Sequence, residues 1–300
     1  MSSPAAGGAT AGAASALRSV AVVGSGTMGN GIAQVLAHNG RAVTLVDLDD
    51  ARLTAAVVSI EKSLQRVAKK GGLSEGDIPG ILARIARSTK IEEAARADLV
   101  IEAVSENLEL KCRLFAQLDR AAPPATILAS NTSSISITRL AAATKRPDRV
   151  IGMHFMNPVP VMQLVEIIRG LATSQATYDR VEAVTRRMGK TPVEVHDAPG
   201  FVSNRVLLPM INEAVFALHE GVGTAEAIDQ VMKLGMNHPM GPLALADLIG
   251  LDVCLDILRV LHDGFGDPKY RPCSLLVKMV DAGYLGRKSG RGFFVYERNG

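Results

Sequence analysis

The residues best suited to chemistry are a histidine and a glutamate that follow one another closely in the chain. His154 and Glu166 lie on two apolar, strand-like runs joined by a proline-containing connection. If these runs pair, the two side chains can face each other. The imidazole could then accept a hydroxyl proton while the carboxylate fixes its tautomer and stabilises the imidazolium. The pair would suit oxidation of an alcohol, although the spacing alone also allows a structural, hydrogen-bonded histidine at a strand end.

A glycine-rich turn near the N-terminus is a second candidate site. The apolar run Val20 to Val23 leads into Gly24-Ser25-Gly26-Thr27-Met28-Gly29, and a helical pattern follows. The first glycine allows a tight turn, the second lets backbone N–H groups approach a pyrophosphate, and the third permits close helix packing. Asp47 ends the next predicted strand, where a carboxylate binds an adenosine ribose diol and repels a 2′-phosphate. No arginine directly follows Asp47, so the pattern favours NAD over NADP.

The elements that position these residues alternate between strand and helix in the first two thirds of the chain. This order predicts an α/β fold with a Rossmann-type, doubly wound, mostly parallel sheet. The predicted strands are Val20 to Val23, Ala42 to Val46, Leu99 to Val104, Ile127 to Ala129 and Val150 to Met153.

After Asp197 the pattern becomes helical, which predicts a Rossmann domain over residues 17–197 and an all-helical domain over residues 198–300. The predicted helices are Phe201 to His219, Ala225 to Leu234, Leu243 to Leu261 and Ser274 to Ala282.

The segment 51–86 is longer than one crossover helix requires, and Gly71-Gly72 divides it into two helical pieces. We expect a helical hairpin that projects from the sheet. Periodicity alone favours a decorated crossover without a function.

Composition excludes several classes of protein. The chain has 300 residues, of which 47% are hydrophobic, and a net charge of only +3, so nucleic acid is not an expected partner. The three cysteines, Cys112, Cys254 and Cys273, are widely separated, which argues against a disulfide framework or a zinc site and favours a reducing, cytoplasmic location. No run approaches the roughly 20 apolar residues of a membrane span. Residues 1–16 lack the features of a targeting signal and are expected to form a disordered tail.

Several motifs together resemble the 3-hydroxyacyl-CoA dehydrogenase family, and they occur in that family's order over nearly the whole chain after the tail. They are Ile101 to Asn107, Ala-Ser-Asn-Thr-Ser-Ser (129–134), His-Phe-Met-Asn-Pro-Val-Pro-Val-Met (154–162), Pro-Gly-Phe-Val-Ser-Asn-Arg (199–205), Lys233 to Pro242 and Gly286 to Phe294. Met156 stands where the family often has another apolar or aromatic residue, which could alter the fit of an acyl chain.

The resemblance implies NAD as cofactor and a 3-hydroxyacyl-CoA, in particular 3-hydroxybutyryl-CoA, as substrate, with no metal. It also implies a homodimer formed through the helical domain. By the same resemblance, His154 is the general base or acid, Glu166 its partner, Ser133 and Asn204 hold the reacting acyl group, and Asn157 lies in the pocket wall. The residues implied for NAD are Glu106, Lys111, Ser133 and Lys288, and those for the substrate are Ser63, Lys70, Lys111, Ser133 and Asn204.

Other interpretations remain open at the level of sequence. Ser133 could simply cap the following helix, and Asn204 could be an ordinary first-turn helix residue. Related dehydrogenases act on free hydroxy acids or sugar acids, and these would not need Ser63 and Lys70. A lysine-dependent β-hydroxyacid dehydrogenase would use a lysine where this chain has the His154 and Glu166 pair. A non-enzymatic sensor of NAD(H) would bind the cofactor without turnover.

Overall fold

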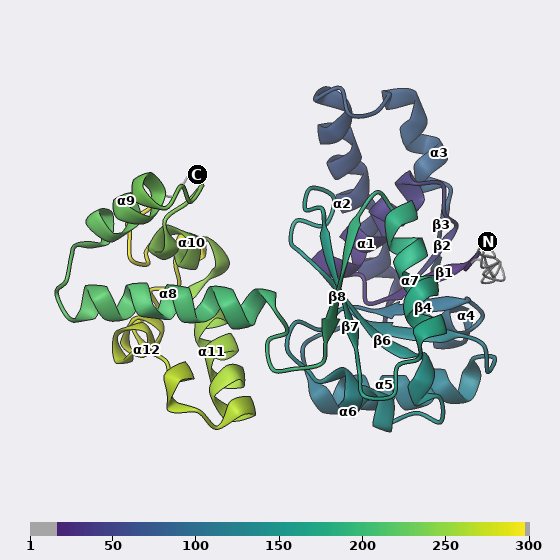
Figure 1. Cartoon of the computed structure of the whole chain (residues 1–300). Helices are drawn as coiled ribbons and strands as arrows, with labels where there is room; N and C mark the ends of the chain where they lie inside the picture. Colours follow the sequence, from purple (N-terminus) through teal and green to yellow (C-terminus); the bar gives the residue numbers. More distant parts are fainter. Residues whose placement is uncertain (1–16, 298–300) are drawn as a thin grey trace, which may run out of the picture. The chain divides into compact units, whose positions relative to one another are not determined.

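The computed structural model describes residues 17–297, so the tail predicted for residues 1–16 lies outside the described residues. The chain divides between Asp197 and Ala198 into two compact units. We refer to them as the sheet unit and the helical unit (Figure 1).

The sheet unit contains, within the described residues, one sheet of eight strands in the order β3-β2-β1-β4-β5-β6-β7-β8. The pairs from β3 to β6 are parallel, β6 and β7 are antiparallel, and β7 and β8 are again parallel. The predicted Rossmann-type, mostly parallel architecture is confirmed. The strands are β1 (Val20–Val23), β2 (Val43–Val46), β3 (Ile85–Ser88), β4 (Leu99–Glu102), β5 (Ile127–Ser130), β6 (Val150–Phe155), β7 (Leu164–Arg169) and β8 (Thr191–His196).

Helices cover both faces of this sheet, and α2 and α3 project from it as an antiparallel pair (Figure 1). The helices are α1 (Thr27–His38), α2 (Asp50–Lys69), α3 (Ile78–Leu82), α4 (Ile91–Ala95), α5 (Leu108–Ala121), α6 (Ile137–Ala142) and α7 (Gln175–Arg187), with short 3-10 turns η1 (Glu75–Asp77) and η2 (Pro147–Arg149).

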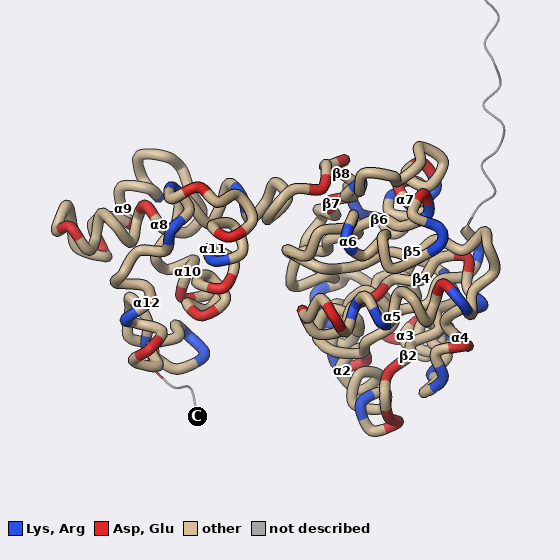
Figure 2. Tube along the Cα trace, turned by 90° about the horizontal axis from the view of Figure 1, so that it is seen from below, with Lys and Arg blue, Asp and Glu red and all other residues tan. Residues whose placement is uncertain are grey.

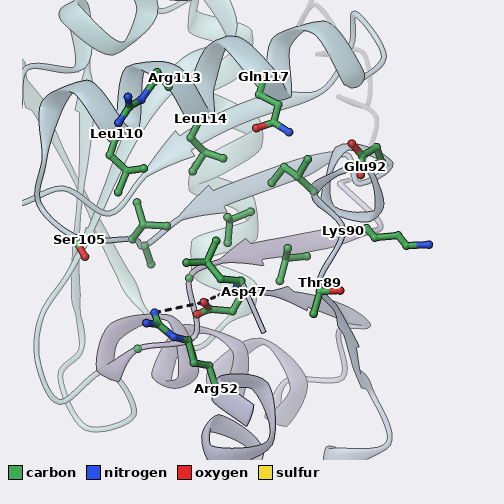
Figure 3. A pocket seen from close by; sticks show the side chains of 18 residues that line it. Asp47, Arg52, Thr89, Lys90, Glu92, Ser105, Leu110, Arg113, Leu114 and Gln117 are labelled. Atoms are coloured by element: carbon green, nitrogen blue, oxygen red, sulfur yellow. Dashed lines mark hydrogen bonds and ion pairs between the residues drawn. The ribbon is translucent and has the colours of Figure 1, made fainter. Parts of the chain in front are cut away.

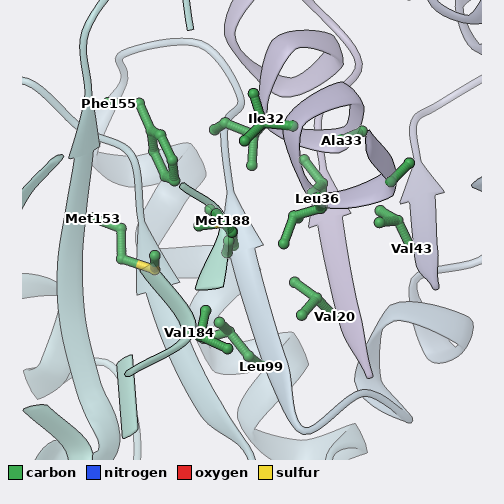
Figure 4. Close-up of a cluster of buried hydrophobic side chains, with 14 of the residues drawn as sticks. Val20, Ile32, Ala33, Leu36, Val43, Leu99, Met153, Phe155, Val184 and Met188 are labelled. Carbon is green, nitrogen blue, oxygen red and sulfur yellow. The ribbon is translucent and has the colours of Figure 1, made fainter. Parts of the chain in front are cut away.

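The main core of the sheet unit lies between the sheet and the helices α1 and α7 (Figure 4). Ile32 and Leu36 of α1 are four residues apart, so they share the helix face that packs on the sheet. Both are 0% exposed, and burying such a side chain contributes about 1.5–3 kcal/mol. This packing fixes the start of α1 against the carboxyl end of β1, where the glycine-rich turn lies.

Two strands were absent from the sequence prediction, and both are edge strands. β3 begins at Ile85, so the helical hairpin predicted for 51–86 ends earlier, with α3 at Leu82. β8 is largely exposed, so its residues alternate less clearly and lack a long apolar run. The predicted strand from Leu99 to Val104 ends at Glu102, because the Val104 N–H turns back to bond the Glu102 carboxylate.

The helical unit has its own apolar core around α8, α10 and α11. Gly250 has φ +106°, a conformation that a helix cannot contain, so the predicted helix from Leu243 to Leu261 is wrong and two helices form instead. The elements are α8 (Ser203–His219), α9 (Ala225–Gly235), α10 (Pro242–Ile249), α11 (Leu251–Phe265) and α12 (Ser274–Asp281), with the 3-10 turns η3 (Pro268–Tyr270) and η4 (Arg287–Ser289). Basic and acidic residues are interspersed along both units (Figure 2).

Candidate active site

The glycine-rich turn lies where the strand order of the sheet reverses, between β1 and β4. This is the position at which doubly wound sheets bind nucleotides. Gly24 has φ +99°, and a Cβ there would lie 2.6 Å from the Ala103 carbonyl oxygen. A Cβ on Gly29 would clash with the backbone of Gly24, whereas the space beside Gly26 is open. The turn therefore requires glycine at both ends and leaves room for a ligand at its centre.

Asp47 joins the carboxyl end of β2 to this turn. Its Oδ2 accepts hydrogen bonds from the Ser25 N–H at 2.6 Å and the Ser25 hydroxyl at 2.7 Å, and its Oδ1 accepts one from the Leu48 N–H at 2.7 Å. Burial opposes ionisation of Asp47, but these hydrogen bonds and the nearby Arg52 charge outweigh it and lower the pKa of the carboxyl group. The carboxylate is therefore ionised beside the turn.

A cavity of about 790 Å³ opens beside Asp47 (Figure 3). One wall is a face of α5, on which Leu110, Arg113, Leu114 and Gln117 are spaced as on successive turns. The Arg52 guanidinium lies 3.8 Å from the Asp47 carboxylate. An arginine therefore stands near Asp47, although none is among the residues that directly follow Asp47 in the chain. The other lining residues are Val23, Gly24, Gly26, Val46, Leu48, Thr89, Lys90, Ile91, Glu92, Ala103, Val104 and Ser105.

The histidine and glutamate lie farther along the sheet, on β6 and β7. His154 stands opposite Glu166 in the antiparallel register, so the predicted pairing of the two runs is confirmed. His154 Nδ1 lies 2.7 Å from Glu166 Oε2, and the two residues are 8% and 2% exposed. Since a carboxylate only accepts hydrogen bonds, Nδ1 carries the proton and Nε2 keeps its lone pair when the ring is neutral.

Ser133 lies in the loop after β5, and Glu106 organises that loop. Glu106 Oε1 accepts hydrogen bonds from the Ser133 N–H at 3.0 Å, the Ser134 N–H at 3.2 Å and the Thr132 hydroxyl. Burial alone would raise the pKa of Glu106, but the Lys111 charge and these hydrogen bonds lower it. Helix α6 is capped by Ser136, so the alternative in which Ser133 caps it is wrong.

Sequence reasoning missed three residues that support this edge of the sheet. Glu102, at the end of β4, is 0% exposed and lies 2.6 Å from the Lys111 ammonium. Asn131 Oδ1 accepts the Phe155 N–H at 3.0 Å, which ties the end of β5 to the strand of His154. Lys190 donates to the Val159 and Met162 carbonyl oxygens in the connection after His154, and burial lowers its pKa. A polar residue at a strand end was the available signal for Glu102 and Asn131.

The remaining residues implied by the resemblance are more dispersed. Ser63 lies within α2 and is half-buried, and Lys70 follows its last residue and is exposed. Asn157 is exposed and precedes Pro158 in a cis peptide bond. Lys111 is 1% exposed, with its ammonium turned toward Glu102.

Two implied residues belong to the helical unit. Asn204 is the second residue of α8. It therefore lies in the first turn of a helix, the position named in the alternative interpretation. Lys288 donates to both oxygens of Asp252 at 2.6 Å. The hydrogen bond and charge of Lys288 lower the pKa of Asp252, although burial acts in the opposite direction.

Potential metal ligands and cysteines are dispersed in the described part of the chain. Among residues 17–297, no group of three or more His, Cys, Asp or Glu side chains could hold a metal ion. The three cysteines are unpaired, and burial raises the pKa of Cys254 to about 12. No described helix is both long and apolar enough to cross a bilayer.

Comparison with known proteins agrees with this geometry. Residues 19–198 match the family model "3-hydroxyacyl-CoA dehydrogenase, NAD binding domain", and residues 200–296 match "3-hydroxyacyl-CoA dehydrogenase, C-terminal domain". The chain belongs to the 3-hydroxyacyl-CoA dehydrogenase family. It is an NAD-dependent oxidoreductase, and the cavity beside Asp47 fits NAD because it combines an open glycine turn with an ionised carboxylate at the end of β2.

Individual relatives cover almost the whole chain. A probable 3-hydroxybutyryl-CoA dehydrogenase of Bacillus subtilis is 59% identical and covers 94% of this chain and 98% of its own. The 3-hydroxybutyryl-CoA dehydrogenase of Bradyrhizobium diazoefficiens is 52% identical, over 94% of this chain and 97% of its own. The crystal structure of (S)-3-hydroxybutyryl-CoA dehydrogenase from Ralstonia eutropha matches with a TM-score of 0.92 and 54% identity, covering 94% of this chain and 100% of that one.

Proposed function

We propose that this enzyme oxidises (S)-3-hydroxybutyryl-CoA to acetoacetyl-CoA with NAD, and catalyses the reverse reduction. The observation that carries the proposal is the 2.7 Å contact between His154 Nδ1 and Glu166 Oε2, on the same sheet as the NAD cavity. The relatives named 3-hydroxybutyryl-CoA dehydrogenase support this substrate over a free hydroxy acid or sugar acid.

In this mechanism, bound NAD supplies the hydride acceptor, and the chain supplies the proton acceptor. His154 Nε2 takes the proton of the substrate hydroxyl, while Nδ1–H remains bonded to Glu166. The Glu166 carboxylate stabilises the imidazolium that forms, because it lies within hydrogen-bond distance and is almost completely buried. In the reverse direction the imidazolium returns the proton to the substrate oxygen.

The family resemblance also suggests which groups orient the substrate. We propose that the Ser133 hydroxyl and the Asn204 amide hold the reacting acyl group, with Asn157 in the pocket wall. Ser133 is supported by its loop, which Glu106 holds through several hydrogen bonds. Short neutral donors of this kind orient a carbonyl without competing for the catalytic proton.

The family resemblance suggests the remaining contacts. Ser63 and Lys70 at the end of α2 would bind the nucleotide part of coenzyme A, where the Lys70 ammonium complements phosphate charge. Glu106, Lys111 and Lys288 would lie toward the nicotinamide half of NAD.

We also propose a cytoplasmic homodimer that associates through the helical unit. The helical unit carries several large apolar side chains that are more than half exposed, which supports association. They are Val202, Val206, Val222, Val231, Leu234, Met236 and Val295. The unpaired cysteines support a reducing compartment. Light scattering coupled to gel filtration should give twice the chain mass, and a monomer at micromolar concentration would refute the dimer.

The decisive assay follows NADH absorbance with acetoacetyl-CoA, beside free acetoacetate and beside NADPH. We expect oxidation of NADH with the thioester, and little or no reaction with acetoacetate or NADPH. Turnover of free acetoacetate would indicate that the enzyme acts on free hydroxy acids. Binding of NADH without any turnover would favour a sensor of the NAD redox state.

A further inference from the structure

A buried charge network occupies the carboxyl ends of β4 and β5. Glu102 is the last residue of β4 and Lys111 lies on α5, and they are 0% and 1% exposed. Lys111 Nζ lies 2.6 Å from Glu102 Oε1. Taking two charges out of water is costly, so a pair this deeply buried requires partners for their remaining hydrogen-bonding capacity.

Those partners are present, and one of them, Glu106, belongs to the loop network described above. The Lys111 ammonium has three donors and three acceptors around it: Glu102 Oε1, the Val104 carbonyl oxygen at 3.2 Å and Glu106 Oε2 at 3.4 Å. Glu102 also accepts hydrogen bonds from the Val104 N–H at 2.7 Å and the Ser130 hydroxyl at 2.6 Å. One carboxylate thus fixes the ends of two neighbouring strands and the direction of the lysine.

The network continues from Lys111 to the loop after β5. Glu106 uses Oε2 for Lys111 and Oε1 for Thr132, Ser133 and Ser134. Without Lys111 in its present position, Glu106 would lose its counter-ion. The backbone of the loop would then lose the ionised acceptor that orders it.

We propose that Glu102 is a positioning residue for the nicotinamide half of the cofactor site. Asp47, directly after β2, lies on the adenosine side of the point between β1 and β4 where the strand order reverses. The other half of the cofactor therefore extends over β4, β5 and β6. Glu102 lies beneath that half and acts through Lys111 and Glu106 on the Ser133 loop. This inference rests on the part of the proposed function that places Glu106 toward the nicotinamide half of NAD.

The test is Glu102→Gln, measured by binding of NADH and of ADP, neither of which involves the thioester substrate. ADP reaches only the adenosine and pyrophosphate part of the site. We expect the Kd for NADH to rise about tenfold, because the neutral amide has one acceptor oxygen in place of two and holds the Lys111 ammonium less firmly, while the Kd for ADP stays within about twofold.

Asp119→Asn is the matched control. Asp119 also lies on α5, and its Oδ1 is 2.6 Å from Arg146 Nε in a pair whose side chains are 7% and 11% exposed. Loss of this pair should lower the midpoint of unfolding without changing either Kd. A merely structural Glu102 would behave like Asp119.

If Glu102→Gln does not fold, the double variant Glu102→Gln with Lys111→Met removes the whole ion pair, a change that buried pairs often tolerate. Its NADH affinity should also fall about tenfold with ADP binding retained, because Glu106 has lost its Lys111 counter-ion in this variant. Wild-type NADH affinity in the folded variants, or an equal loss of ADP and NADH affinity, would overturn the proposal. Failure of the thioester assay alone would leave this binding result intact and would instead refute the proposed substrate.

Discussion

The two units bury their acidic side chains in opposite electrostatic surroundings. In the sheet unit, Glu102 contacts the Lys111 ammonium, and Asp47 combines three hydrogen bonds with a nearby arginine. In the helical unit, Asp247 is 1% exposed and Asp229 is 6% exposed, and each is held by neutral donors. A buried carboxyl group thus meets a cation in the first case and only neutral donors in the second.

Asp247 holds the end of the described chain onto α10. It accepts hydrogen bonds from the Phe293 N–H at 2.9 Å, the Phe294 N–H at 3.0 Å and the Tyr296 hydroxyl at 3.0 Å. Burial raises the pKa of Asp247, these hydrogen bonds only partly offset it, and the charge of Asp229 raises it further. The pKa of Asp47 moves the other way. A buried carboxyl group is therefore acidic only where cations or enough donors favour its charged form.

The largest expected effect tests whether His154 in the sheet unit takes part in catalysis or only stabilises the fold. His154→Ala should lower kcat about a thousandfold, because the proton acceptor is removed, while the Kd for NADH stays within about twofold. Stopped-flow turnover and NADH fluorescence titration measure the two quantities. His196→Ala, at the exposed end of β8, is the control and should behave as wild type. A parallel loss of NADH affinity would make His154 a structural residue.

The next effect concerns the anchor in the helical unit. Asp247→Ala should lower the free energy of unfolding of that unit by about 3 kcal/mol, because three donors lose their acceptor. Urea unfolding gives the energy, and hydrogen exchange should show faster exchange at the Phe293 and Phe294 amides. Asp256→Ala, whose side chain is 75% exposed, is the control. A comparable loss of NADH binding would contradict a purely structural role for Asp247.

A smaller effect concerns discrimination between cofactors in the sheet unit. Asp47→Ser should weaken NADH binding about tenfold, since hydrogen bonds to a charged acceptor are lost. It should also improve NADPH binding, because the repulsion of a 2′-phosphate disappears and the Arg52 guanidinium loses one of its two carboxylate partners, Asp47 and Asp49. Titration of both cofactors measures the ratio of affinities. Asp50→Asn is the control: it removes an exposed charge at the start of α2 that does not line the cavity, so its ratio should not change.

The smallest effect is a pH dependence of opposite sign in the two units. The folded pKa of Asp47 lies below its ordinary value of 3.8, so its stabilising contribution is complete above 3.8 and is lost as the pH falls from there to the folded pKa. The folded pKa of Asp247 lies above 3.8, so its protonation stabilises the folded helical unit as the pH falls from that raised value toward 3.8.

Urea unfolding of wild type and Asp247→Asn at several pH values isolates the second contribution. The difference in free energy of unfolding should shift in favour of wild type as the pH falls toward 3.8. A difference that is constant with pH would mean that Asp247 does not titrate in this window.

Much of this molecule follows from local sequence. The glycine turn and Asp47 lie at the ends of buried apolar strands, and such runs predict a parallel sheet whose carboxyl edge gathers them. His154 and Glu166 belong to neighbouring antiparallel strands with a short connection, so the register follows from a small loop. The edge strands β3 and β8 were missed because exposed strands tolerate polar residues and lose the apolar signal.

The charge networks were decided by the tertiary structure. Glu102 meets Lys111 nearby in the chain, but its second oxygen meets Ser130 only because β4 and β5 are neighbours in the sheet. Asp247 anchors Phe293 and Phe294 across a long stretch of intervening chain. A sequence determines which residues can be buried, whereas the partners of a buried charge depend on which distant segments fold against it, because desolvation and Coulomb energy act through space.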